Sequence, residues 1–175
     1  DPVEGVERTR QLAERALQLS PALVVGRATL VWVHILNWDW AAAETEAQRA
    51  LAIDPRNGTA LNAAGYLSLA LGHWDAAERQ FRAALARNPF FLFTNNGMGD
   101  VYYNRGRYAE AEVMYRKALA LAPGGGRNNQ LIGKALLQQG KAEAALAMVQ
   151  QDADEGSRLR YLPIMLQANG RQAEA

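Results

Sequence analysis

The stretch GHWDAAERQFRAALARNP at residues 72–89 is followed 34 residues later by GRYAEAEVMYRKALALAP at residues 106–123. Both begin with glycine, carry an aromatic residue two positions later and close on proline. The same 34-residue spacing relates residues in five sets of positions along the chain, which is typical of a repeat protein. The sets are Pro21, Pro55, Pro89 and Pro123; Gly65, Gly99 and Gly133; Gly72, Gly106 and Gly140; Ala43, Ala77, Ala111 and Ala145; and Ala16, Ala50, Ala84 and Ala118.

Each repeat is predicted to form two amphipathic helices, because apolar residues recur at three- and four-residue steps on both sides of a short break. The repeated prolines end the second helix, since proline lacks a backbone donor and disfavours helix in the residue before it. The glycines at 72, 106 and 140 follow the first helix, where a left-handed residue is favoured. Trp38 stands at that place in the first full repeat, and Asn37 before it is expected to supply the left-handed turn.

The glycines at 65, 99 and 133 lie inside the first helices, where glycine costs about 1 kcal/mol relative to alanine. That cost is offset if the missing side chain lets two helices approach closely. We therefore expect these glycines to face the repeated alanines at 77, 111 and 145 of the second helices.

The 34-residue period, with its small, aromatic and proline positions, resembles the tetratricopeptide repeat family. The resemblance covers nearly the whole chain and implies an all-α fold, a right-handed superhelical solenoid of antiparallel helix pairs. The whole chain, 1–175, is then a single solenoid with these parts: half repeat 1–23; repeats 24–57, 58–91 and 92–125; short repeat 126–155; and partial repeat 156–175. GRQAEA at 170–175 repeats the GRYAEA of 106–111 and marks the last of these parts.

Three departures from the pattern predict local differences. Val31 replaces the interhelix glycine of the first full repeat, so the helices there should lie further apart or cross differently. Pro163 takes the same place in the last repeat and should kink or shorten its helix. The acidic residues Asp152, Asp154 and Glu155 should cap the helix that follows them, where negative charge is favourable.

Composition excludes several classes of protein. The chain has no cysteine and two histidines, which rules out disulfide scaffolds and thiolate zinc sites and leaves little for histidine chemistry. We expect no enzyme activity, no cofactor and no metal site. The net charge of +1 argues against a nucleic-acid partner. No apolar run approaches the roughly 20 residues of a membrane span, and no signal peptide opens the chain, so a cytoplasmic location is expected.

The C-terminal stretch ALAMVQQDADEGSRLRYLPIMLQANGRQAEA, residues 145–175, looks like the end of repeat arrays in bacterial signalling proteins. Those proteins join the array to a nucleotide-cyclase or winged-helix domain. The likeness implies a regulatory part of a larger bacterial protein. The first residue is Asp1 rather than methionine, which indicates a fragment or a processed product.

In the family, the first helices line a concave face that binds extended peptides or partner helices. The second, fifth, ninth, twelfth and thirteenth residues of each repeat make the contacts. Carried onto this chain, the resemblance implies a groove formed by Trp32, Asn62, Tyr66, Phe93, Asn96, Asp100, Tyr103, Asn104, Arg127, Gln130, Lys134, Gln138 and Arg160.

Three amides in this set, Asn62, Asn96 and Gln130, occupy equivalent places and form an amide ladder. A primary amide offers donors and an acceptor, so it can grip a peptide backbone whatever its sequence. The alternative is that the amides are solvated or cap neighbouring turns.

The predicted groove is apolar near Trp32 and polar further along the chain. It suits a ligand with an apolar anchor and an acidic tail, which Arg127, Lys134 and Arg160 would meet. Alternatively, Trp32 is simply buried and the basic residues are ordinary surface charges.

The favoured function is a non-catalytic module that binds a protein or peptide partner, or another domain of the same chain. Two other functions remain open. Open solenoid ends predict self-association into a homodimer. A pocket around Trp32 and Tyr66 would predict a small-ligand sensor.

Overall fold

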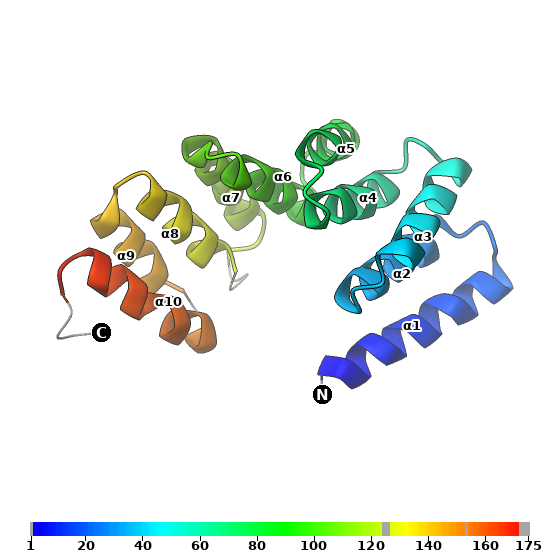
Figure 1. Ribbon diagram of the computed structural model, residues 1–175, viewed down its shortest axis with the longest axis horizontal. Helices are drawn as coiled ribbons and strands as arrows, with labels where there is room; N and C mark the ends of the chain where they lie inside the picture. The colour runs from blue at the N-terminus through cyan, green and yellow to red at the C-terminus, as the bar shows by residue number, and fades with distance from the viewer. Residues whose placement is uncertain (1, 124–126, 153, 172–175) are drawn as a thin grey trace. The chain divides into compact units, whose positions relative to one another are not determined.

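The computed structural model describes residues 2–123, 127–152 and 154–171. Within these ranges the chain forms ten α-helices and no β-strand, which confirms the all-α prediction. It divides into two compact units, Asp1–Pro89 and Phe90–Ala175, each of which is described by itself (Figure 1).

The first unit contains five helices, drawn from blue to green in Figure 1. They are α1 (Pro2–Leu19), α2 (Val24–Leu36), α3 (Trp40–Ile53), α4 (Gly58–Ala70) and α5 (Trp74–Arg87). Helices α2 and α3 pair, as do α4 and α5, while α1 lies against α2. A cluster of mostly small buried residues joins α2, α3 and α4: Ala28, Val31, Ala43, Ala47, Ala63, Ala64 and Leu67.

The second unit contains the other five helices. They are α6 (Leu92–Asn104), α7 (Tyr108–Leu121), α8 (Asn128–Gln138), α9 (Ala142–Gln150) and α10 (Glu155–Ala168). Helices α6 and α7 pair, α8 and α9 pair, and α10 packs on both α9 and α8. Its core is built around the fully buried side chains of Tyr115, Ile132, Val149 and Met165.

The glycines inside the first helices do allow close approach, but the alanines predicted to face them are not the main neighbours. A Cβ added to Gly65 would lie 2.5 Å from the ring of Phe81, and one added to Gly99 would meet the ring of Tyr115. At Gly133 the neighbour is Val149, at 2.9 Å, with the Ala145 carbonyl further off at 3.3 Å. The prediction is corrected accordingly, because the residue one helical turn after each alanine fills the space.

The turn after α2 differs from its prediction. Trp38 itself is left-handed, with φ 61°, while Asn37 has φ −91°. In the later pairs Gly106 and its equivalents take this conformation, with φ 73° at Gly106. The Trp38 ring meets the Trp40 ring edge-on at 5.5 Å between centroids, and this contact helps to offset the backbone cost.

Helix α10 follows an acidic cap, as predicted. The carboxylate of Asp154 accepts a hydrogen bond from the Ser157 N–H at 2.8 Å, and Asp152 accepts one from the Asp154 N–H at 3.1 Å. Pro163 lies inside α10, which nevertheless continues from Glu155 to Ala168, so the proline does not end the helix. Most of the GRQAEA repeat lies outside the described residues, since these stop at Arg171.

No helix in the described part of the chain combines the length and the apolar character needed to cross a membrane.

Candidate functional site

In the second unit, three helices line one pocket of about 170 Å³. Tyr103 comes from α6, three residues come from α8, and three come from α10. The lining residues are Tyr103, Lys134, Leu137, Gln138, Tyr161, Ile164 and Met165. Helices α6 and α8 are each the first member of a helix pair, and α10 follows the last pair. Side chains from these three helices meet at the pocket.

Lys134 supplies the positive charge of this pocket. Its Nζ lies 5.0 Å from the centroid of the Tyr103 ring, a distance at which an ammonium is attracted to the ring face. None of the described carboxylates forms an ion pair with Lys134. The ammonium therefore retains donor capacity that a ligand can use.

Tyr103 is held on both sides. Its ring meets that of Tyr108 at 5.3 Å between centroids, in an edge-on arrangement. Burial, together with Tyr108, raises the pKa of the Tyr103 phenol, while a hydrogen bond with the Gln138 side chain acts against this. The phenol stays neutral at physiological pH, and the fixed ring forms one wall of the pocket.

Asp100 lies on α6 one turn before Asn104, and its carboxylate is largely buried. Its Oδ1 accepts a hydrogen bond from the Tyr115 hydroxyl at 2.8 Å, and its Oδ2 lies 3.9 Å from Arg127 Nη2. Burial raises the pKa of Asp100 above 3.8, although Tyr115, Arg127 and Lys134 oppose that rise. Burial and the Asp100 charge likewise raise the pKa of Tyr115 above its usual range.

The amides of the second unit have different surroundings. Asn96 is 7% exposed, and its Oδ1 has no hydrogen-bond partner within the described ranges. Gln130 donates to Ser157 Oγ at 3.3 Å, which links α8 to α10. Asn104 is exposed and donates to the Asp100 carbonyl of its own helix at 2.8 Å. Of these three amides, Asn96 is the one whose buried acceptor has no partner among the described residues, a property that Asn128 and Asn129 at the start of α8 share.

Three other predicted residues of this unit are exposed. Phe93 is 56% exposed on the first turn of α6, and its ring meets that of Phe91 at 6.2 Å. Arg127 precedes α8 and Arg160 lies on the second turn of α10. None of the three lines the pocket.

In the first unit, Trp32 of α2 and Tyr66 of α4 lie against each other, with ring centroids 4.6 Å apart. Tyr66 also meets Phe81 of α5 edge-on at 5.0 Å. Asn62, one turn before Tyr66, is 3% exposed. These rings fill the space between the helices and form an aromatic cluster that supports the packing of α2, α4 and α5.

The structure thus brings together Tyr103, Lys134 and Gln138 of the predicted set. The pocket also uses Leu137, Tyr161, Ile164 and Met165, which are not in the predicted set. Leu137 could have been found, because it follows Tyr103 by 34 residues. The prediction took Arg160 from the last repeat, but the structure turns Tyr161, Ile164 and Met165 of α10 into the pocket, and Arg160 does not line it.

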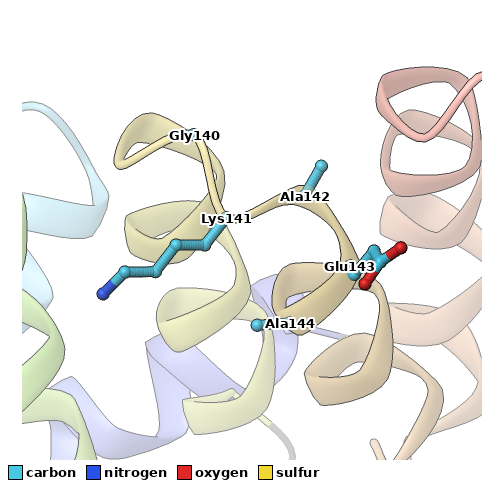
Figure 2. A pocket seen from close by; sticks show the side chains of 5 residues that line it. All are labelled: Gly140, Lys141, Ala142, Glu143 and Ala144. Carbon is cyan, nitrogen blue, oxygen red and sulfur yellow. The ribbon is translucent and has the colours of Figure 1, made fainter.

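A second, more open pocket of about 400 Å³ lies where α8 turns into α9. It is lined by Gly140, Lys141, Ala142, Glu143 and Ala144, and Figure 2 shows the Lys141 and Glu143 side chains pointing away from each other. Lys141 is engaged by the Gln139 side chain at 2.8 Å. Polar groups do not converge here, and this pocket offers a poor binding site. Across the described ranges, no three histidine or acidic side chains are placed to hold a metal ion.

Comparison with known protein families agrees with this architecture of repeated helix pairs. Two family models described as tetratricopeptide repeat match residues 62–126 and residues 102–162. A comparison with curated protein sequences gave no significant match.

Several solved structures are similar to this chain. PilW, described as a widely conserved type IV pilus biogenesis factor, is 17% identical with a TM-score of 0.83, over 99% of this chain and 84% of that chain. TTC0263, described as a thermophilic TPR protein in Thermus thermophilus, is 21% identical with a TM-score of 0.74, over 99% of this chain and 93% of that one. YrrB, described as a TPR protein with an unusual peptide-binding site, is 19% identical with a TM-score of 0.65, over 91% and 84%.

These structural similarities establish the fold of antiparallel helix pairs. The two family models together span residues 62–162, which is more than half of the sequence. The chain therefore belongs to the tetratricopeptide repeat family and has the fold of a protein-interaction scaffold.

Proposed function

We propose that the second unit binds an extended segment of a protein partner on the face built by α6, α8 and α10. The observation that carries this proposal is the pocket that these three helices line together, with an apolar floor and a lysine that has no ion pair among the described residues. Apolar lining with a few well-placed polar groups is typical of binding sites. YrrB, which has the same fold, is described as having a peptide-binding site, and this supports a peptide as the ligand.

Asn96 of α6 adds a second point of attachment only if the packing around it opens, because its Oδ1 is buried in this structure. A buried acceptor without a partner costs roughly 1–3 kcal/mol, so a donor that reached Asn96 Oδ1 would gain more than an ordinary surface contact. A peptide backbone N–H is such a donor. Two members of the predicted amide ladder, Asn96 and Gln130, lie in the second unit and are part of this proposal.

The bound segment belongs either to a separate protein or to another part of the same polypeptide. In the second case the repeats would regulate their own chain. That is the role implied by the resemblance of the C-terminal stretch to bacterial signalling proteins.

The proposal is tested with a random peptide library. The isotope-labelled chain is panned against the library, and a selected peptide is then titrated while backbone amide shifts are followed by NMR. We expect the shifts to concentrate on α6, α8 and α10. Tyr103→Ala combined with Ile164→Ala should weaken binding about tenfold or more. Shifts confined to α7 and α9, or a library from which nothing is selected, would overturn the proposal.

A second candidate, self-association, is favoured by the exposed apolar side chains of α1. Val3, Leu12 and Leu19 are 75%, 65% and 75% exposed, and the two leucines lie seven residues apart on one face of the helix. A second copy of the chain would cover such a stripe. Light scattering over a concentration series should then show a rising mass that Leu12→Glu with Leu19→Glu abolishes. A constant monomer mass rejects this candidate.

A further inference from the structure

The pocket between α6, α8 and α10 has a composition that selects among peptides. Its volume of about 170 Å³ equals that of about six molecules of liquid water, enough for one bulky apolar side chain. The lining is apolar at Leu137, at Met165 and at the rings of Tyr103 and Tyr161. The Met165 side chain is fully buried. The pocket therefore favours an aliphatic or aromatic anchor.

Among the lining residues, the charged one is Lys134. Lys134 contributes an ammonium, and no carboxylate is among the lining residues. The nearby carboxylate of Asp100 is already bonded to Tyr115 at 2.8 Å and lies 3.9 Å from Arg127. The Asp100 and Lys134 charges attract each other, but within the described part of the chain the two residues form no ion pair, so an anion brought by the ligand would meet an ammonium with donors to spare beside a low-polarity surface.

We propose that this pocket recognises an acidic peptide segment in which an apolar side chain stands next to an aspartate or glutamate. The apolar side chain enters between Tyr103 and Tyr161, and the neighbouring carboxylate pairs with Lys134 and accepts from the Gln138 amide. This inference rests on the proposed function of the second unit and adds the chemical class of its ligand. An aspartate or glutamate alone would leave the apolar lining empty, so the anchor and the acid are both required.

The experiment is a selection of amidated random peptides by the full chain and by two charge variants. Amidation removes the terminal carboxylate, so any acidic preference comes from side chains. The wild type should enrich peptides with an apolar residue next to Asp or Glu. Lys134→Glu should keep the apolar preference and replace the acidic preference with a basic one. Lys117→Glu, the same change on an exposed residue of α7 outside the pocket, is the matched control and should behave as the wild type.

The selected acidic peptide is then measured by titration calorimetry. Lys134→Glu should weaken its binding about tenfold or more, and rising salt should weaken the wild type toward the same value. Circular dichroism confirms that the variants fold. Enrichment of apolar residues without an acidic preference, or an acidic preference that persists in Lys134→Glu, overturns this inference but leaves the proposed function standing. Selection of no peptide by the wild type overturns both. If peptides with a free C-terminus bind and their amidated forms do not, the ligand is a chain end, and the side-chain proposal is wrong.

Discussion

The carboxylate of Asp100 is a charged group in a mostly dry environment, and its pKa has a direct consequence for stability. Burial raises this pKa in the folded chain above the unfolded value of 3.8. A raised pKa means that the folded state prefers the protonated acid. The stability contributed by Asp100 is therefore complete below about pH 3.8 and is lost as the pH rises through the folded pKa.

We expect Asp100→Asn to stabilise the chain at pH 7, because the amide can still accept from Tyr115 without carrying a buried charge. The gain should shrink as the pH falls toward 3.8. Urea unfolding of both proteins between pH 4 and 7 measures it. Glu110→Gln is the control, since Arg107 lowers the pKa of Glu110 and the variant should show no such gain. A variant that is less stable than the wild type at pH 7 would contradict the prediction.

The left-handed residue after each first helix offers a second prediction at the scale of one residue. Gly106 has φ 73°, and an added Cβ would meet nothing within 4 Å, so any cost of a side chain there comes from the backbone alone. Gly106→Ala should lower the free energy of unfolding by about 1–2 kcal/mol. Gly106→Asn should cost less, because asparagine tolerates this conformation better. Equal losses in both variants, measured by urea unfolding, would show that the conformation is not the cause.

At the scale of the helix pair, small and large residues exchange places between repeats. Gly65 of α4 receives the ring of Phe81, whereas in the preceding pair the fully buried Val31 of α2 is matched by Ala47 of α3, 34 residues before Phe81. Val31 and Ala47 lie in one buried cluster, so we expect the small residue on α3 to compensate for the larger one on α2. A small residue on one helix is thus set against a larger one on the other, although the summed size varies, as at Gly133 and Val149.

A double-mutant cycle tests this exchange. Gly65→Val should destabilise the chain by about 1–3 kcal/mol through overpacking, and Phe81→Ala by about 3–5 kcal/mol through a cavity. The double variant copies the Val31 and Ala47 pair, so its loss should be smaller than the sum by about 1 kcal/mol or more. Additive losses in chemical denaturation would contradict the compensation.

Much of this arrangement could be predicted from the sequence, and the exceptions have physical causes. The spacing of prolines and glycines predicted the helix pairs because those residues act on the backbone locally. The ring of Phe81 at Gly65 was missed, since Ala47, Phe81, Tyr115 and Val149 differ in type and form no visible ladder. Lys134 and Gln138 were predicted for the site, but the burial of Asn96 depends on how neighbouring helices pack, which a repeat pattern does not encode.

At the scale of the whole chain, the 34-residue spacing continues through Pro89 and does not mark the division into Asp1–Pro89 and Phe90–Ala175. Each unit nevertheless has a buried cluster made only of its own residues. Repeat proteins gain stability mainly from contacts between near neighbours. We expect fragments 1–89 and 90–175 to form helices separately, with far-UV circular dichroism that adds up to about that of the full chain. A fragment that lacks helix would show that its cluster does not suffice.

The two units also differ in their chromophores. All four tryptophans, at positions 32, 38, 40 and 74, belong to the first unit, whereas five of the six tyrosines belong to the second. Tryptophan emission excited at the red edge of the absorption band therefore follows the first unit alone. Tyr103 and Tyr161 line the pocket of the second unit, so a ligand that enters it should perturb tyrosine absorption. The chain thus carries a natural label for each unit, and unfolding of one can be followed separately from occupancy of the other without any added dye.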